Sequence, residues 1–417
     1  MPGPSNARIQ TDVLIVGAGP AGSTAAYHLA RHGIDVTVVD KARFPREKVC
    51  GDGLTPRAIV QLEKLGVDTE DPRFERHEGL RIYSRKTVLE LPWPALEGFP
   101  AYGLTMTRSS FDELLARRAE KAGAVLREQA EALEPTFDDG WVTGARVRDL
   151  GRDEEVDVRA RFVIAADGAA SRFAGRAGVR RDPTKPLGIA ARRYYRIERH
   201  PGPWLEVWMD LWDGDALMPG YGWLFALSDG SVNLGAGLLN TFKNFRDVSA
   251  QQVFEAFSRM LPEDWNVTEE TAEGAALSGP LPMGMNRAPV AVPGMLVAGD
   301  AAGMVNPFNG EGIAYAMESG ELAAELIHEA LIADRPGLAQ LYPTLLRERY
   351  ARYFRIGTNF VRAIGHPTVM RTLTEYGLPQ AWLMRFALRV MGNLTDGRTG
   401  DLQDRIMYGL ERLARVS

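Results

Sequence analysis

The stretch that decides the fold of this chain reads DVLIVGAGPAG and occupies residues 12–22. Its first part, Asp12–Val16, is a short apolar run, and Ala21–Arg31 has helical spacing that stops before Gly33. A second apolar run, Ile34–Val39, follows at once. The order of strand, glycine-rich turn, helix and strand predicts a right-handed βαβ unit at the start of the fold.

The glycines of this turn indicate a dinucleotide site. Gly17, Gly19 and Gly22 fit the pattern G-x-G-x-x-G, in which a side chain would keep a pyrophosphate away from the backbone amides. The positive end of the helix dipole favours each nearby negative charge by about 0.3 to 1 kcal/mol. Asp40 ends the second strand, where a carboxylate accepts hydrogen bonds from ribose hydroxyls. An ordinary tight turn is the alternative, and the motif alone does not separate NAD from FAD.

Two later segments decide between these cofactors. The tetrapeptide AADG at residues 165–168 follows an expected strand at Arg161–Ala166, and Gly299-Asp300 precedes a loop at 301–312. Together with the first glycine turn, and in this order, they resemble the three FAD fingerprints of the flavoprotein monooxygenase and geranylgeranyl reductase superfamily. The resemblance covers most of the first 330 residues. It implies that the chain binds one FAD.

The resemblance also implies which residues contact the FAD. The loop Asn306–Gly312 opens an expected helix at Ile313–Leu331, and in the family the positive end of this helix faces the flavin ring and raises its potential. The implied cofactor-binding residues are Gly17, Gly19, Pro20, Ala21, Gly22, Asp40, Lys41, Cys50, Gly51, Arg108, Asp167, Gly168, Gly299, Asp300, Gly310, Gly312 and Ile313.

Two further motifs narrow the resemblance to the geranylgeranyl reductases. The segment KVCGDG at residues 48–53 is similar to their KxCGDG element, and Tyr221, Trp223 and Phe225 are similar to their YxWxFP element. Ala226 departs from this pattern because the family has proline there.

These motifs carry the implied chemistry. The family implies that Cys50 lies beside the flavin ring and that Cys50 and Tyr221 are the catalytic proton donors to test. It also implies that Tyr221, Trp223 and Phe225 bind a prenyl chain. The residues by themselves also fit purely structural roles. A lone cysteine is often an inert apolar residue, and three aromatic side chains can be part of the hydrophobic core.

The strand pattern predicts a second, antiparallel β unit. In the sequence it lies between the segments that form the nucleotide-binding unit. From Pro186 to Gly237 the apolar period changes to two, and Ser228-Asp229-Gly230 marks a hairpin. The predicted fold class is α/β with α+β character. An FAD-binding Rossmann-like domain of the glutathione reductase and p-hydroxybenzoate hydroxylase type joins an antiparallel β substrate domain and a helical C-terminus. The predicted FAD-binding domain comprises residues 1–75, 101–180 and 281–340, the substrate domain 76–100 and 181–280, and the helical region 341–417.

Composition excludes several classes of protein. A formal net charge of −5 argues against nonspecific nucleic-acid binding. With a single cysteine the chain cannot form an intramolecular disulfide, so nothing indicates an oxidising compartment. No charge-free apolar run reaches the roughly 18 to 20 residues that span a bilayer. We therefore expect a cytoplasmic protein, with peripheral contact to the inner face of the cytoplasmic membrane left open. His28 and His32 have metal-compatible spacing but no third ligand, so no metal site is expected.

The C-terminal segment differs in charge from the rest. Residues 341–417 contain 12 arginines against 6 acidic residues. An expected amphipathic helix at Trp382–Val390 carries Arg385 and Arg389 beside apolar side chains, a combination that fits an anionic bilayer. A helix that covers the core and has one solvated face is the alternative.

The resemblance implies an FAD-dependent reductase that saturates C=C bonds of a polyprenyl chain. The substrates that it implies are geranylgeranyl groups, archaeal lipids and menaquinone side chains. An excess of arginine over lysine indicates a GC-rich bacterial genome, and by analogy this favours the menaquinone side chain among them. Only one G-x-G-x-x-G follows a strand, so NAD(P)H, another reductant or an electron-donor protein is expected to visit transiently. The rival is a flavin-dependent monooxygenase or halogenase acting on a small apolar or aromatic substrate, although the halogenase element WxWxIP is absent. A non-catalytic electron relay is the third alternative.

Overall fold

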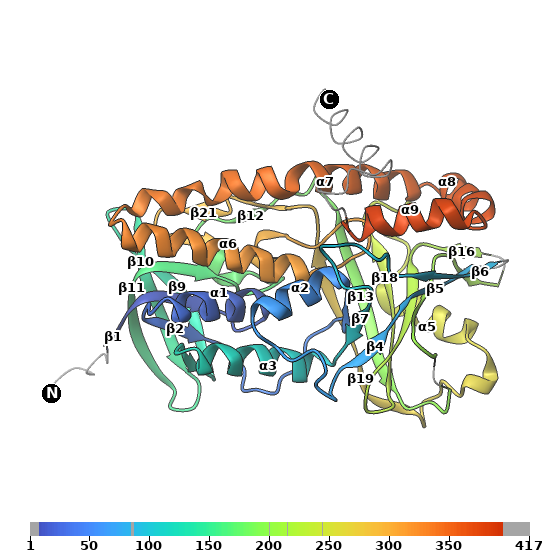
Figure 1. The fold of residues 1–417 in the computed structure, drawn as a ribbon, viewed down its shortest axis with the longest axis horizontal. Coiled ribbons are helices and arrows are strands. Elements are labelled where there is room, and N and C mark those ends of the chain that lie inside the picture. Colours follow the sequence, from blue (N-terminus) through green and yellow to red (C-terminus); the bar gives the residue numbers. More distant parts are fainter. Residues whose placement is uncertain (1–7, 85–86, 200, 215, 244, 395–417) are drawn as a thin grey trace.

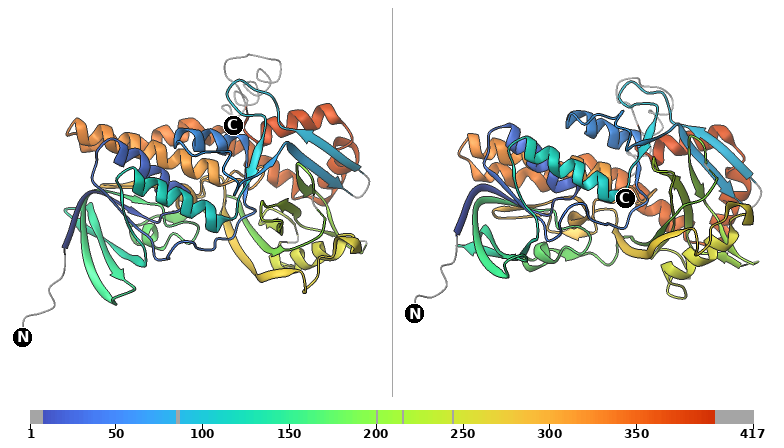
Figure 2. Two further views of the ribbon diagram at one scale, coloured as in Figure 1. Left: turned by 60° about the horizontal axis from the view of Figure 1, so that its bottom comes forward. Right: turned by 90° about the horizontal axis from the view of Figure 1, so that it is seen from below.

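Two sheets occupy opposite ends of an elongated molecule, and long helices run along one side of it (Figures 1 and 2). The computed structural model describes residues 8–84, 87–199, 201–214, 216–243 and 245–394. None of the helices in this described part of the chain combines the length and the apolar composition that crossing a bilayer requires.

The first sheet is built on the predicted βαβ unit. Its main path runs β21-β22-β11-β1-β2-β8, parallel except for β21, and β10 and β9 continue it in antiparallel order from the first half of β11. The strands are β1 (Arg8–Val16), β2 (Val36–Val39), β8 (Val125–Arg127), β9 (Ala130–Asp138), β10 (Trp141–Asp149), β11 (Glu154–Ala165), β21 (Ala291–Val292) and β22 (Met295–Val297).

Three helices pack beside this sheet, namely α1 (Pro20–Arg31), α3 (Arg108–Lys121) and α6 (Ile313–Ile332). Helix α1 contacts both α3 and α6 (Figure 1). Gly320 permits the close crossing of α1 and α6, because a Cβ there would overlap the carbonyl oxygen of Ala21. The helix predicted at residues 313–331 is thereby confirmed.

Strand β11 begins seven residues before the predicted strand at Arg161–Ala166. Only its last part is apolar and fully buried, where it lies between β1 and β22. Its first part pairs with β10 near the molecular surface and carries exposed charged side chains. The apolar run therefore marked only the buried half of the strand.

The second sheet confirms the predicted β unit. Its order is β19-β13-β18-β17-β14-β5-β6. The predicted hairpin is formed by β17 and β18, which pair from Tyr221–Gly237 to Ala226–Val232. All pairings are antiparallel except the one between β14 and β5, which corrects the wholly antiparallel prediction. The strands are β5 (Gly79–Ser84), β6 (Thr87–Pro92), β13 (Leu187–Tyr195), β14 (Trp204–Trp208), β17 (Tyr221–Ala226), β18 (Val232–Leu239) and β19 (Ala272–Pro282).

Glu206 is a charged residue within the period-two segment, and it is fully buried. Its carboxylate accepts hydrogen bonds from Arg81 and Arg199 and, at 2.8 Å, from the hydroxyl of Tyr83. A buried carboxylate is tolerable because it is paired and hydrogen-bonded. The two long arginines reach it from the neighbouring strand and loop.

The remaining elements connect and cover the two sheets. Two-stranded pairs are β12–β20 and β15–β16, and β3, β7 and β4 form a small sheet between the large ones. These elements are β3 (Gly53–Leu54), α2 (Pro56–Lys64), β4 (Glu75–His77), β7 (Gly103–Thr105), α4 (Arg172–Arg176), β12 (Arg180–Arg181), β15 (Leu211–Asp213), β16 (Ala216–Met218), α5 (Ala250–Met260) and β20 (Arg287–Ala288).

The described part of the predicted C-terminal helical region is helical. It contains α7 (Tyr342–Ile364), α8 (Pro367–Thr372), the π-helical turn η4 (Leu373–Gly377) and α9 (Ala381–Met391). Residues 395–417 of the predicted region lie outside the described residues. The division of the chain into three domains stays a prediction.

Candidate active site

The glycine turn forms a cradle that fits a pyrophosphate. Gly17 has φ +100°, and a Cβ there would overlap the carbonyl oxygen of Ala166, whereas a Cβ at Gly22 would overlap the carbonyl oxygen of Gly17. Both glycines are thus required by the packing of the chain itself. At Gly19, however, the nearest atom to a built Cβ is an Arg46 nitrogen at 3.6 Å. The space over Gly19 is open, as expected where a cofactor approaches the backbone.

Asp40 lies where the predicted ribose contact requires a carboxylate. It is buried at the end of β2, and its two oxygens accept hydrogen bonds from the backbone amides of Ala18 and Ala42, each at 2.9 Å. These bonds hold the carboxylate beside the glycine turn. A carboxylate oxygen accepts more than one hydrogen bond, so capacity remains for ribose hydroxyls.

The other two fingerprint segments meet the same turn. Asp167 follows β11, and one of its oxygens accepts from the amide of Phe173 at 2.8 Å. Its other oxygen is buried without a hydrogen-bond partner, and burial raises the pKa of Asp167. A built Cβ at Gly299 would lie 2.9 Å from the Cβ of Ala21 at the start of α1. The three segments therefore surround one site, and their donor and acceptor groups fit FAD.

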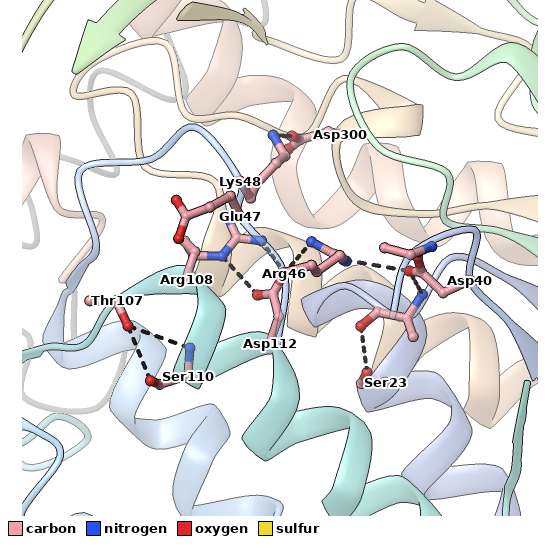
Figure 3. Close-up of polar contacts among 12 residues, drawn as sticks. Ser23, Asp40, Arg46, Glu47, Lys48, Thr107, Arg108, Ser110, Asp112 and Asp300 are labelled. Atoms are coloured by element: carbon pink, nitrogen blue, oxygen red, sulfur yellow. Dashed lines mark hydrogen bonds and ion pairs between the residues drawn. The ribbon is translucent and has the colours of Figure 1, made fainter. Parts of the chain in front are cut away.

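A chain of alternating charges borders this site (Figure 3). Arg46 lies 3.5 Å from Asp40 and 2.9 Å from Asp112, and Asp112 accepts two hydrogen bonds from Arg108 at 2.7 and 2.8 Å. The guanidinium of Arg46 is also the nearest group to the open space over Gly19. The sequence did not single out Arg46, which is placed to pair with a pyrophosphate.

The KVCGDG segment crosses the second sheet as a strap, defined here as residues 48–53. A Cβ at Gly51 would contact the rings of Phe225 and Trp223, and at Gly53 again Phe225. Side chains at these positions would lift the strap from the aromatic strand β17. The two family motifs are therefore in direct packing contact.

A buried hydrogen-bond network fixes the strap. Asn233 donates to the carbonyl oxygen of Cys50 at 2.9 Å and to Asp52 at 2.8 Å, while it accepts from the indole nitrogen of Trp223 at 2.9 Å. Asp52 also accepts from the hydroxyl of Tyr194 at 2.7 Å. One asparagine thus joins both motifs. A polar residue inside the apolar strand β18 was the sequence signal for it.

Tyr221 reaches the loop before α6. A Cβ built at Gly310 would lie 2.8 Å from the Tyr221 hydroxyl, and Gly310 has φ +77°. Burial, and to a lesser extent the nearby Cys50, raise the pKa of Tyr221 to about 12. The guanidinium of Arg108 also lies near Cys50, which raises the pKa of Arg108. Cys50, Tyr221 and the 306–312 loop are therefore brought together.

For three other predicted site residues, the structure gives the position but does not test the predicted role. Trp223 is buried against Gly51 and Gly235, so it packs as core, and its role in substrate binding stays a prediction. Phe225 is half-buried between the strap and Leu205. Lys41 is exposed beyond the end of β2, and its cofactor contact also stays a prediction.

Asp52 makes the stability of the protein depend on pH. Burial raises its pKa from 3.8 to about 6, although hydrogen bonds from Tyr194 and Asn233 lower it. A raised carboxyl pKa stabilises the fold below pH 3.8, and this contribution is lost as the pH rises through 6. In urea unfolding at saturating FAD, wild type should therefore lose about 1.4 kcal/mol between pH 5 and pH 7.5 relative to Asp52→Asn.

Asp182 provides the matched control. Hydrogen bonds from Thr184 lower its pKa, so its contribution to stability changes only below pH 3.8. The stability difference between wild type and Asp182→Asn should stay constant from pH 5 to pH 7.5. A constant difference for Asp52→Asn over the same range would contradict the raised pKa.

Known proteins resemble this chain over nearly its whole length. Residues 10–193 match the family described as FAD binding domain. Menaquinone reductase of Mycobacterium tuberculosis is 37% identical over 406 residues, covering 97% of this chain and 96% of the relative. Digeranylgeranylglycerophospholipid reductase of Thermoplasma acidophilum is 31% identical over 350 residues, covering 82% and 84%.

A solved structure is also similar to this chain. The geranylgeranyl bacteriochlorophyll reductase-like protein of Thermoplasma acidophilum superposes with a TM-score of 0.78 at 26% identity, covering 97% of this chain and 100% of that one. The predicted fold class and FAD cofactor are confirmed. Identity above 30% over most of both chains shows common membership, and the chain belongs to the geranylgeranyl reductase family of FAD-dependent oxidoreductases.

Proposed function

We propose that this chain uses FAD to saturate C=C bonds in the polyprenyl side chain of menaquinone. The observation that carries the proposal is the convergence of Cys50, Tyr221 and Gly310 in one site beside the FAD cradle. The relative named menaquinone reductase has higher identity and coverage than the one named digeranylgeranylglycerophospholipid reductase. This difference favours menaquinone over a lipid with two geranylgeranyl chains.

The site residues supply the proton that this reaction needs. Bound and reduced FAD supplies a hydride to one alkene carbon. Tyr221 donates a proton to the other carbon, and solvent then reprotonates the phenolate, so each saturated bond gains two hydrogens. A pKa of about 12 keeps the Tyr221 proton in place at neutral pH. Cys50 lies close enough to be the alternative donor.

The FAD cradle assigns proposed roles to the remaining residues. The amides of the glycine turn and Arg46 hold the pyrophosphate, and Asp40 accepts from the ribose. Asp167, with one unpartnered oxygen, accepts from a hydroxyl of the extended cofactor. The loop ending at Gly312 directs its amides and the dipole of α6 toward the flavin ring. Asp52 and Asn233 hold the strap and so position Cys50.

The proposal is tested with purified, FAD-loaded protein reduced under anaerobic conditions. Menaquinone in detergent is added, and the product is analysed by mass spectrometry. We expect a gain of two hydrogens per saturated bond and reoxidation of the flavin. Unchanged menaquinone would overturn the substrate assignment. Quinones extracted from cells with and without the gene provide the second readout.

Oxygen consumption separates the reductase from its rivals. A monooxygenase or halogenase uses one O₂ per product, whereas the proposed reaction proceeds without oxygen. Stoichiometric oxygen use would therefore overturn the reductase. Turnover of the lipid alone by the reduced protein excludes a pure electron relay, because a relay needs a protein acceptor.

The substrate suggests where the protein works. A menaquinone side chain resides in the bilayer, so we propose that the protein acts at the inner face of the cytoplasmic membrane as a peripheral protein. NAD(P)H, another reductant or an electron-donor protein reduces the flavin between turnovers.

A further inference from the structure

Large apolar side chains are exposed on the C-terminal helices. The exposed fractions are 38% for Val369, 41% for Leu373, 71% for Tyr376 and 69% for Trp382. Spacings of four and three residues place the first three on one side of the continuous helix formed by α8 and η4. Trp382 follows in the first turn of α9. These four side chains are called the C-terminal apolar face below.

The face is separate from the side of these helices that packs inward. Met370, Leu378 and Leu388 are buried and belong to the apolar clusters beneath the helices. The inward side of these helices therefore covers the core, as in the alternative given for the amphipathic helix at Trp382–Val390. The outer side presents apolar groups where solvated polar residues would be expected.

Exposed basic side chains lie on the same helices and beside their start. Arg371 and Arg385 are exposed on the same helices, and exposed Lys243 is tied to their start by a backbone hydrogen bond from its amide to Gly365. Glu375 is the one acidic residue between His366 and Asn393. This local excess of positive charge stands out in a chain of net charge −5. Tyr and Trp with nearby arginines match the interface of an anionic bilayer.

On the inward side of these helices, apolar packing extends toward Gly310. Met370, the neighbour of Val369, lines a cavity of about 30 Å³ together with Met209 and Phe242. It shares an apolar cluster with Met283, whose methyl group lies 3.9 Å from a Cβ built at Gly310. Methionine side chains adapt their shape readily.

We infer that the C-terminal apolar face docks on the surface of an anionic lipid bilayer. Figures 1 and 2 show α8 and α9 at one end of the molecule, beside β5 and β6. In that position they can lie on a bilayer while the FAD cradle stays in water. The choice of a bilayer as the partner rests on the proposed function, because a polyprenyl substrate is a membrane lipid. The binding itself is measurable without turnover.

Flotation with FAD-loaded full-length protein tests the inference. Vesicles of phosphatidylcholine with phosphatidylglycerol should carry wild type upward, whereas the double variant Tyr376→Ser, Trp382→Ser should partition at least about tenfold less. The double variant Arg371→Gln, Arg385→Gln should partition roughly 25-fold less, from about fivefold per arginine, and lose its preference for anionic vesicles.

The matched control uses apolar side chains exposed at the other end of the molecule. Ile332 and Leu341 are 67% and 49% exposed at the turn between α6 and α7. The double variant Ile332→Ser, Leu341→Ser should float as wild type does. Equal flotation of the Tyr376 and Trp382 variant would overturn the inference, as would wild type that binds neither kind of vesicle. Sedimentation showing a dimer that this variant abolishes would assign the face to a second copy instead.

Turnover separates failure of this inference from failure of the proposed function. In detergent, the docking variants should reduce menaquinone at the wild-type rate, and in vesicles they should reduce it more slowly. A Tyr221→Phe variant should show the opposite behaviour, with normal flotation and slow turnover in both. Wild type that floats but never reduces menaquinone would refute the function and leave the docking face standing.

Discussion

A Tyr221→Phe variant should reduce its substrate at least about 100-fold more slowly than wild type. The reason is that an unactivated alkene accepts hydride only if a proton is delivered to the other carbon, and general acid catalysis contributes about 100-fold to 10,000-fold. The hydroxyl lies beside Gly310 at the predicted flavin edge, and a pKa of about 12 keeps it protonated. The loss should fall on kcat, with KM changed less than about threefold, because phenylalanine keeps the apolar ring.

Separate half-reactions locate the defect. FAD content and the rate of flavin reduction should equal those of wild type, and only reoxidation of the flavin by substrate should slow. Tyr195→Phe is the control, because Tyr195 packs in the apolar cluster on the other face of the second sheet. If Tyr221→Phe retains the full rate while Cys50→Ala loses it, the thiol is the proton donor. If neither variant is slower, the proton comes from solvent and the catalytic prediction is wrong.

The parts of this site that the sequence predicted are those set by local backbone geometry. Gly17 has φ +100°, and a Cβ at Gly22 would overlap Gly17 within the same turn. The hairpin Tyr221–Leu239 was predicted from alternation and from a Ser-Asp-Gly turn. The association of the strap with β17 came from family motifs, and the structure gives its physical basis in the contacts of Gly51 and Gly53.

The polar network of the site depends on residues far apart in sequence. Asn233 and Asp52 are 181 positions apart, and Tyr194 and Asp52 are 142 apart. No periodicity connects them, although Asn233 stands out as the polar residue of the apolar strand β18. Glu206 illustrates the same limit, since its two arginine partners, Arg81 and Arg199, come from other segments. Long-range pairing of buried charges has no local signal.

A Gly19→Ala variant should bind FAD about 100-fold more weakly and yet fold normally. Gly19 has φ −76°, which alanine adopts, and a Cβ there meets no atom closer than 3.6 Å. The free protein should therefore change in stability by less than about 1 kcal/mol. The methyl group instead occupies the space through which the pyrophosphate reaches the backbone amides, and losing a charge-assisted hydrogen bond costs about 3 kcal/mol. Titration of the apoprotein with FAD, followed by flavin fluorescence, measures the affinity.

Two further glycine variants serve as controls for Gly19→Ala. Gly22→Ala should destabilise the apoprotein itself by more than about 2 kcal/mol, because the added Cβ overlaps the carbonyl oxygen of Gly17. Gly175→Ala, in α4 with no atom near the built Cβ, should leave FAD affinity unchanged. If Gly19→Ala binds FAD as tightly as wild type, the cofactor does not pass over the glycine turn. The assigned pyrophosphate position would then be wrong, although the overlap at Gly17 and Gly22 would still explain why the fold needs glycine there.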